Sequence, residues 1–245
     1  MLEESFRIGK AISAILNSDE KKGFDFSKNW NSKVIKIGIT GSSGAGKSSF
    51  INQLTKRFTD FGFSVAILMI DPTSHQTGGA LLADRVRLDS KFFSCNVFTR
   101  SLATRNALNG LPEMLIPVLH FLENQRFDLI FIETIGIGQD AISVRDLCEV
   151  LITLPSNDVG DILQFFKIGA FEVSDYIFFN KSDLLKEGKC IKTETLINEY
   201  LSIKHWAQRQ PPLPFYGNTI AVDGIAEIFQ SLHERIQELL NNEKL

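Results

Sequence analysis

Cysteine, histidine and long apolar runs are all scarce in this sequence. The three cysteines, Cys95, Cys148 and Cys190, lie far apart, and only four histidines occur in 245 residues. Metal and redox motifs need such side chains a few residues apart, so the pattern excludes a sequence-local metal site and a redox pair. The longest apolar run, residues 65–70, is far shorter than the roughly 20 residues of a membrane-spanning helix.

The amino-terminal residues lack the features of a targeting segment. Secretory signals begin with basic residues before an apolar run, and mitochondrial presequences are rich in arginine and poor in acids. This sequence begins MLEESFRIGK, with Glu3 and Glu4 at its start. We therefore expect a soluble, cytoplasmic protein with free thiols and no membrane partner.

An excess of positive charge is also missing. Lys and Arg number 26 against 29 Asp and Glu, which gives a net charge of -3. Because phosphate neutralisation usually leaves a basic balance, nucleic acid is not the expected partner. The hydrophobic fraction of 44% and the charged fraction of 22% are typical of a globular protein and exclude a disordered chain or a coiled coil.

Short apolar runs rich in β-branched and aromatic residues predict the strands. They cover residues 34–39, 63–70, 93–98, 127–132, 150–154, 176–179 and 215–220, and helical spacing is found over 8–16, 111–122 and 225–240. Since these runs do not alternate with polar residues, both faces of the sheet should be buried. We predict an α/β fold with a mostly parallel sheet and helices on both faces. The 20 phenylalanines fall largely in or beside the runs and should fill the core.

The most specific motif is a phosphate-binding loop, G-x-x-x-x-G-K-[ST], between the first predicted strand and a helix. Glycines let backbone N–H groups approach phosphate oxygens, and the helix N-terminus favours anions. Lys47 should reach the β- and γ-phosphates, and Ser48 should bind Mg²⁺. The residues expected to contact the nucleotide are Gly41, Ser42, Ser43, Gly44, Ala45, Gly46, Lys47, Ser48 and Ser49.

A second motif, N-K-x-D at residues 180–183, selects the base. It follows the predicted strand 176–179, at the edge where open α/β sheets bind ligands. The carboxylate of Asp183 would accept hydrogen bonds from guanine N1–H and the 2-amino group, which adenine cannot donate. Asn180 and the stem of Lys181 would brace the loop and the base. The pattern favours GTP over ATP.

Acidic residues end two further predicted strands. Asp71 follows the run 65–70, and Glu133 follows the run 127–132. A carboxylate there can hold Mg²⁺ or orient an attacking water, and Gly136 would let the backbone approach the γ-phosphate. Asp84 and Arg87 fit a solvated helix face as well as they fit a role in the site.

Several stretches, in order, resemble the MeaB/ArgK-type P-loop GTPases, the group whose human member is linked to methylmalonic aciduria. The resemblance covers about residues 5–242. Besides the phosphate loop, it rests on DPTS (71–74), GGALLADRVRL (78–88), FTRSLATRNALNGL (98–111), ETIGIGQD (133–140), GDILQFFKIGAFEVSDYIFFNKSD (160–183) and GIAEIF (224–229).

The resemblance implies a G-domain that acts as a chaperone of a cobalamin-dependent acyl-CoA mutase of the methylmalonyl-CoA mutase type. Such proteins gate cofactor delivery and protect the mutase, with GTP hydrolysis that is slow without the partner. It assigns Asp71, Asp84 and Glu133 to Mg²⁺ and water, and Lys167 and Arg87 to switch segments.

The sequence also departs from the pattern of that family. In place of the usual Ser-Ala base loop stand Asn218, Thr219 and Ile220, and the switch stretch 155–161 is longer and less glycine-rich. The sequence ends at Leu245, so we expect the usual C-terminal dimerisation arm to be absent; a homodimer formed in another way stays open.

Because the motifs need one continuous sheet, we expect a single GTPase domain over 33–245 with a helical extension over 1–32. Two other functions stay open: a regulatory or scaffold G-domain with little hydrolysis, and a nickel-insertion type GTPase. The scattered cysteines and histidines argue against the second.

Overall fold

The structure is a computed structural model, and it describes most of the chain. The described residues are 2–17, 34–71, 96–104, 111, 114–134, 139–156, 163, 169–183, 202, 210–221 and 223–242. Among them, no helix combines the length and the apolar character that crossing a membrane requires.

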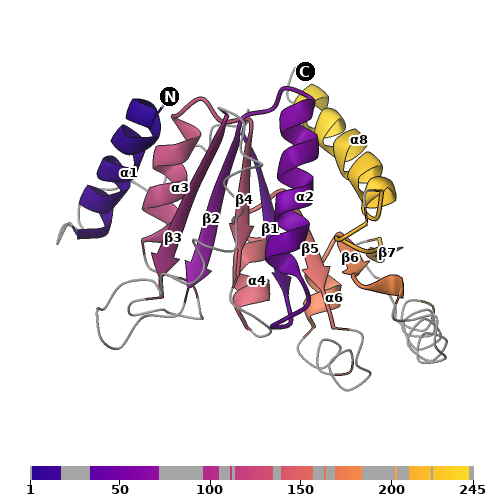
Figure 1. Cartoon of the computed structure of the whole chain (residues 1–245). Helices are drawn as coiled ribbons and strands as arrows, with labels where there is room; N and C mark the ends of the chain where they lie inside the picture. The colour runs from indigo at the N-terminus through magenta and orange to yellow at the C-terminus, as the bar shows by residue number, and fades with distance from the viewer. Residues whose placement is uncertain are drawn as a thin grey trace.

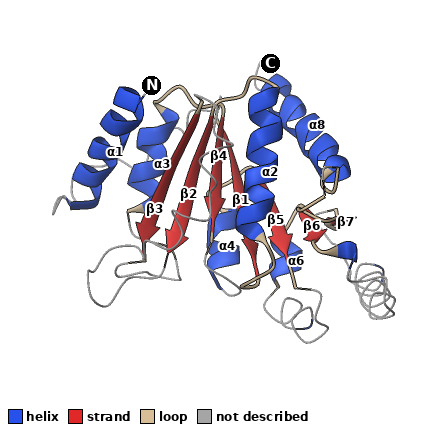
Figure 2. Cartoon of the chain, viewed as in Figure 1, coloured by secondary structure: helices blue, strands red, loops and turns tan. Residues whose placement is uncertain are grey.

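Seven strands form one parallel sheet, which Figures 1 and 2 show with helices on both faces. The order across the sheet is β3-β2-β4-β1-β5-β6-β7, and every neighbouring pair is parallel. The strands are β1 (Ile35–Gly41), β2 (Val65–Asp71), β3 (Val97–Ala103), β4 (Leu129–Glu133), β5 (Val150–Leu154), β6 (Tyr176–Phe179) and β7 (Leu213–Tyr216). The described helices are α1 (Leu2–Asn17), α2 (Lys47–Asp60), α3 (Leu115–Glu123), α4 (Gln139–Arg145), α6 (Ala170–Val173) and α8 (Ala226–Asn242). The predicted α/β fold is confirmed.

The two faces of the sheet are buried in separate apolar clusters, because successive strand residues point to opposite faces. In β2, the first cluster takes Val65, Ile67 and Met69, and the second takes Ala66, Leu68 and Ile70. Helices α2 and α8 cover the first face, while α1, α3 and α4 cover the second. This double burial explains why the strands read as continuous apolar runs.

Phenylalanine fills the first cluster, as predicted. Phe50 of α2 stacks on Phe178 of β6 with ring centroids 4.6 Å apart, and Phe58 lies 4.9 Å from Phe229 of α8. Phe50, Phe58 and Phe178 are fully buried, and burying each such side chain contributes about 1.5–3 kcal/mol. Helix α2, which begins at the phosphate loop, is thereby fixed on the sheet.

Two predicted strands end more than two residues from the observed ends. The third strand runs from Val97 to Ala103 rather than over 93–98, and the last strand is Leu213–Tyr216 rather than 215–220. β7 lies at the sheet edge, where Pro214 is tolerated because one side of the strand needs no N–H donor. The chain then turns at Gly217, where a Cβ would lie 1.9 Å from the carbonyl oxygen of Gly224. Residues 217–220 are therefore loop.

A buried ion cluster lies at the amino edge of the sheet, where the parallel strands begin. The Lys36 side chain, 3% exposed, places its Nζ 2.8 Å from Glu123 Oε1 and 3.2 Å from Glu149 Oε1. The backbone N–H of Lys36 also donates to Glu149 Oε2 at 2.6 Å. These contacts join β1, the end of α3 and the residue before β5.

Candidate functional site

The phosphate loop, residues 42–46, connects β1 to α2 at the carboxyl edge of the sheet, where the parallel strands end (Figure 2). Gly41, Gly44 and Gly46 have φ values of 146°, 75° and 94°, which favour glycine. A Cβ at Gly41 would lie 2.0 Å from the Leu154 carbonyl oxygen, and one at Gly46 would lie 2.2 Å from Asn180 Nδ2. The glycines of the motif are thus required by backbone conformation and by close packing.

Helix α2 begins with backbone groups rather than with a side-chain cap. Its N-cap is Gly46, and no side-chain cap hydrogen bond is formed there. The first N–H groups of a helix need an acceptor from outside the helix, and the helix dipole favours an anion at this end. This start of α2 is suited to phosphate oxygens. Ser43 and Ser49 lie exposed in the loop and in the first turn of α2.

Lys47 folds back over its own loop. Its Nζ donates to the carbonyl oxygens of Gly41 at 2.9 Å and Ser42 at 3.0 Å, and the residue is only 8% exposed. The hydroxyl of Ser42 accepts a hydrogen bond from Ser156 N–H at 3.0 Å, which ties the loop to the segment after β5. The lysine is therefore held at the loop that would surround the phosphates.

The predicted Mg²⁺ ligands Ser48 and Glu133 are brought together. Ser48 Oγ donates to Glu133 Oε1 at 3.0 Å, and Glu133 is 8% exposed. β4 lies between β1 and β2, with Glu133 in register with Ile39 and Met69, and Asp71 follows two residues later on β2. Asp71 is 2% exposed.

This set of oxygen atoms fits a hard cation such as Mg²⁺, which takes carboxylate and hydroxyl oxygens. Within the described residues, no group of three or more His, Cys, Asp or Glu side chains could hold a metal ion. Mg²⁺ usually keeps several waters and binds substrate phosphates besides one or two carboxylates. The donors present therefore fit an ion that is shared with a nucleotide.

Two threonines beside this set were not predicted as site residues. Thr134 Oγ1 donates to Thr40 Oγ1 at 3.0 Å, and both side chains are buried. The bond joins the ends of β4 and β1 directly beside Glu133 and Gly41. It depends on the order of the strands in the sheet, for which the sequence gives no signal.

The base motif is tied to the phosphate loop. Asn180, 3% exposed, donates from Nδ2 to the Ala45 carbonyl at 2.9 Å. Its Oδ1 accepts from the N–H groups of Lys181 at 2.8 Å and Thr219 at 3.0 Å. Lys181 adopts φ 59° and donates from Nζ to the Gly44 carbonyl at 3.0 Å. These bonds join the base motif to the phosphate loop, and the predicted bracing of the base by Asn180 and Lys181 stays a prediction.

Residues 218–220 lie against Asp183. Asn218 Nδ2 donates to Asp183 Oδ1 at 2.9 Å, and Ile220 N–H donates to Asn218 Oδ1 at 2.8 Å. From α2, Gln53 Nε2 donates to the Thr219 carbonyl at 3.1 Å, a brace that no sequence pattern indicates. The two motifs and the 218–220 loop thus form one continuous rim.

Four predicted site residues lie outside the described part of the chain. They are Asp84, Arg87, Gly136 and Lys167. Of the predicted switch stretch 155–161, only Pro155 and Ser156 are described.

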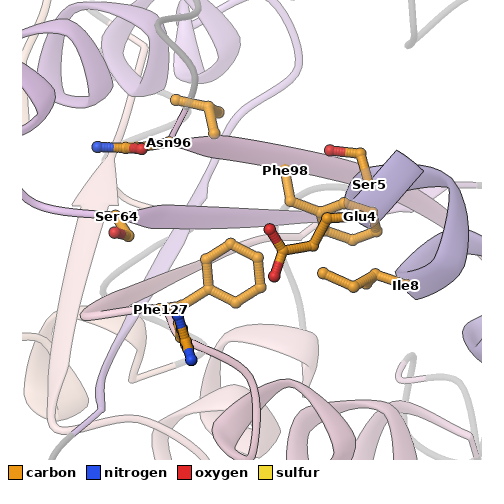
Figure 3. A pocket seen from close by; sticks show the side chains of 9 residues that line it. Glu4, Ser5, Ile8, Ser64, Asn96, Phe98 and Phe127 are labelled. Atoms are coloured by element: carbon orange, nitrogen blue, oxygen red, sulfur yellow. The ribbon is translucent and has the colours of Figure 1, made fainter. Parts of the chain in front are cut away.

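A pocket of about 200 Å³ lies elsewhere, between α1 and the beginnings of β2 and β3 (Figure 3). Figure 3 shows the Glu4 carboxylate beside the rings of Phe98 and Phe127. Ser64 and Asn96, which precede β2 and β3, also line it. This pocket belongs to the amino edge of the sheet and is separate from the phosphate loop.

Comparison with known proteins supports a GTP-binding site. The family described as "Methylmalonyl Co-A mutase-associated GTPase MeaB" matches residues 27–244. A protein of Caenorhabditis elegans named methylmalonic aciduria type A homolog, mitochondrial, is 32% identical over 91% of this chain and 56% of its own length. The fused isobutyryl-CoA mutase of Cupriavidus metallidurans is 33% identical over 80% of this chain and 18% of its own length. The chain spans about half the length of several curated relatives.

Solved structures show the same fold. A crystal structure titled LAO/AO transport system kinase aligns over 99% of this chain and 80% of its own, with a TM-score of 0.64 and 20% identity. At that identity the likeness concerns the fold alone. The family match covers the phosphate loop, the strand-end acids and the base motif, and the chain therefore belongs to the methylmalonyl Co-A mutase-associated GTPase family MeaB.

Proposed function

We propose that this GTPase binds GTP and GDP with Mg²⁺ at the carboxyl edge of the sheet, and that its nucleotide cycle serves a cobalamin-dependent acyl-CoA mutase. One observation supports the proposed nucleotide binding above all others. Asn180 and Lys181 of the base motif donate hydrogen bonds to the carbonyl oxygens of Ala45 and Gly44 in the phosphate loop. This linkage supports the proposal because it ties the segment that contains Asp183, the proposed guanine acceptor, to the phosphate loop.

Each residue of the rim has a proposed task. Lys47 exchanges its carbonyl partners for the β- and γ-phosphate oxygens, whose negative charge makes them stronger acceptors. Ser48 and Glu133 hold Mg²⁺, with Asp71 and Asp84 as further acids for the ion or its waters. Lys167 and Gly136 act at the γ-phosphate. The bound ion supplies charge neutralisation of the phosphates.

Guanine selection falls to Asp183. Its carboxylate accepts hydrogen bonds from N1–H and the 2-amino group, and Asn180 orients the loop through hydrogen bonds to Ala45, Lys181 and Thr219. Adenine lacks the 2-amino group and has an acceptor at N1, so ATP would leave the carboxylate unpaired. A site built around such hydrogen bonds rejects the analogue that lacks them.

The proposed action on a mutase is supported by the similarity of this chain to known proteins. The family is named for association with methylmalonyl Co-A mutase, and a relative named fused isobutyryl-CoA mutase contains a segment like this chain. A segment that occurs within a mutase in one protein is well suited to act on a separate mutase in another. We propose that GTP hydrolysis gates cofactor delivery to that partner and protects it.

The test is GTP and ATP turnover with Mg²⁺, with and without purified methylmalonyl-CoA mutase. We expect GTP to be preferred about 100-fold or more, and the mutase to raise the rate. The matched variant is Asp183→Asn, whose amide can donate to the 2-oxo group of xanthine, so preference should move from GTP to XTP. Equal turnover of GTP and ATP would overturn the base assignment. A GTPase rate that the mutase leaves unchanged would favour a regulatory or scaffold role instead.

A further inference from the structure

Two buried threonines join the strand that leads into the phosphate loop to the strand that carries Glu133. Thr134 Oγ1 donates to Thr40 Oγ1 at 3.0 Å, and the two residues are 1% and 0% exposed. Thr40 directly precedes Gly41, the first residue of the phosphate-loop motif. Thr134 directly follows Glu133. The bond therefore ties the start of the phosphate loop to the residue after a proposed Mg²⁺ ligand.

The end of β4 is held on both faces of the sheet. Since successive strand residues point to opposite faces, the side chains of Glu133 and Thr134 point to opposite sides. On the side of α2, Glu133 accepts the hydroxyl of Ser48 at 3.0 Å. On the other side, Thr134 is bonded to Thr40, and its backbone N–H donates to the Ile39 carbonyl oxygen at 3.0 Å. The peptide that follows Glu133 is thus fixed to β1, which limits how far the carboxylate can move.

We propose that the bond between Thr134 and Thr40 is a positioning hydrogen bond, which sets where the Glu133 carboxylate meets the Mg²⁺ ion that is shared with the nucleotide. This inference rests on the proposed function, since it assumes that Glu133 serves that ion or its waters. Neither threonine is proposed to contact the ion, because both act through the backbone of Glu133. Residues that orient metal ligands change metal affinity without binding the metal.

A purely structural role needs its own control, because two buried hydroxyls on neighbouring strands can simply satisfy each other. Thr153 of β5 forms such a pair, with its Oγ1 2.5 Å from Ser174 Oγ, and the two residues are 0% and 2% exposed. Thr153 is the register partner of Thr40, so it lies at the same depth in the sheet. Its bond leads to the end of α6 rather than to the Glu133 segment. Thr153→Val is therefore the matched control.

The expected size of the effect follows from the path between Thr134 and the ion. Direct partners of metal ligands typically change metal affinity about 10- to 100-fold when they are removed. Thr134 acts through one peptide unit, and an ordinary hydrogen bond is worth a factor of about two to ten. We therefore expect the Mg²⁺ dissociation constant of the GDP complex to rise about three- to tenfold. GDP binding in EDTA should not change, because the phosphate loop and the base motif stay intact.

The experiment titrates Mg²⁺ into the GDP complex by calorimetry and measures GDP binding in EDTA. Thr134→Val, Thr40→Val and the double variant should weaken Mg²⁺ binding by the same factor, since each removes the same bond. Thr134→Ser, which keeps a hydroxyl, and Thr153→Val should stay within about twofold of the wild type. The double variant should also keep the denaturation midpoint, because replacing both partners of a buried bond by apolar groups of the same shape is nearly neutral.

Three outcomes would overturn the inference. If Thr134→Val lowers the denaturation midpoint but leaves the Mg²⁺ constant unchanged, the bond is only structural. If Thr153→Val weakens Mg²⁺ binding as much, the loss reflects a general loosening of the sheet edge. If Thr134→Ser behaves like Thr134→Val, the hydroxyl is not the group that matters.

Failure of the proposed function would look different. A wild type whose GDP complex binds no Mg²⁺, or a Glu133→Gln variant with the wild-type Mg²⁺ constant, would remove the assumed role of Glu133 itself. The inference about the threonines fails alone when Glu133→Gln weakens Mg²⁺ binding and the threonine variants do not.

Discussion

The two ends of β1 hold two buried lysines with opposite kinds of partner. Lys36, at the amino edge, is 3% exposed and contacts the carboxylates of Glu123 and Glu149. Lys47, just beyond the carboxyl edge, is 8% exposed and donates to the carbonyl oxygens of Gly41 and Ser42. The two carboxylates carry full negative charges, whereas the two carbonyl oxygens are neutral dipoles.

The difference separates a structural lysine from the lysine that we propose to bind phosphate. A buried ion pair resists exchange, because removing either partner leaves an uncompensated charge. A lysine held by carbonyl groups gains when a phosphate arrives, since hydrogen bonds between ionised groups are about twice as strong as neutral ones. Both lysines are buried, so burial does not distinguish them, whereas the carboxylate and carbonyl partners do.

The largest effect is expected at the amino edge. Lys36→Met should lower the free energy of unfolding by about 3–5 kcal/mol, because Glu123, 2% exposed, loses the ammonium of Lys36. Chemical denaturation measures this, and GDP affinity of the folded protein should not change. Adding Glu123→Gln to the same protein should restore part of the loss. A loss below about 1 kcal/mol would remove the distinction between the two lysines.

The Lys47→Ala variant should keep most of the free energy of unfolding and lose most of the GTP turnover. We expect GTP turnover to fall about 100- to 1,000-fold, the usual cost of losing one group that stabilises the transition state. The free energy of unfolding should drop by about 1 kcal/mol, the worth of ordinary hydrogen bonds. Single-turnover kinetics and denaturation on the same preparation provide the comparison. Unchanged turnover would exclude the loop from the reaction.

The smallest effect concerns Cys148, which also lies near the amino edge. Burial raises the pKa of its thiol from 9.0 to about 12. The Cys148 thiol therefore loses its proton at a lower pH in the unfolded chain than in the folded protein. The contribution of the thiol to stability is complete below pH 9 and is lost as the pH rises toward 12. The slope should approach about 1.4 kcal/mol per pH unit.

Cys148→Ala is the matched variant for that slope, because all other titrating groups remain. Denaturation at pH 8, 9, 10 and 11 should show a steeper loss of stability in the wild type than in the variant. Identical slopes in the two proteins would mean that the thiol is not held neutral by burial. The phosphate loop, which lies at the other end of β1, should be unaffected.

Contiguous motifs were predictable from the sequence, and contacts between distant segments were not. The phosphate loop and the base motif each lie within a few residues, so their positions at strand ends follow from the apolar runs before them. The Thr40–Thr134 bond and the Asn218–Asp183 bond depend on which strands become neighbours. That order is set by tertiary packing rather than by local pattern.

The errors at β7 have a local cause. Leu213 and Pro214 lie outside the predicted strand 215–220, and proline cannot donate to a central ladder. At the sheet edge this restriction does not apply, and the strand starts earlier than the apolar run 215–220 suggests. The roles of Asp84, Arg87, Gly136 and Lys167 stay predictions, because they lie outside the described residues.

The order of the strands has a consequence for synthesis on the ribosome. The phosphate loop belongs to the centre of the sheet, β2-β4-β1, which is complete once residue 133 has been made. The proposed guanine site needs β6, β7 and the 218–220 loop, which emerge much later. The phosphate loop itself packs against Leu154 of β5 and against Asn180. Because domains generally fold as units, we expect phosphate binding and base discrimination to be acquired together, once these later segments have been made.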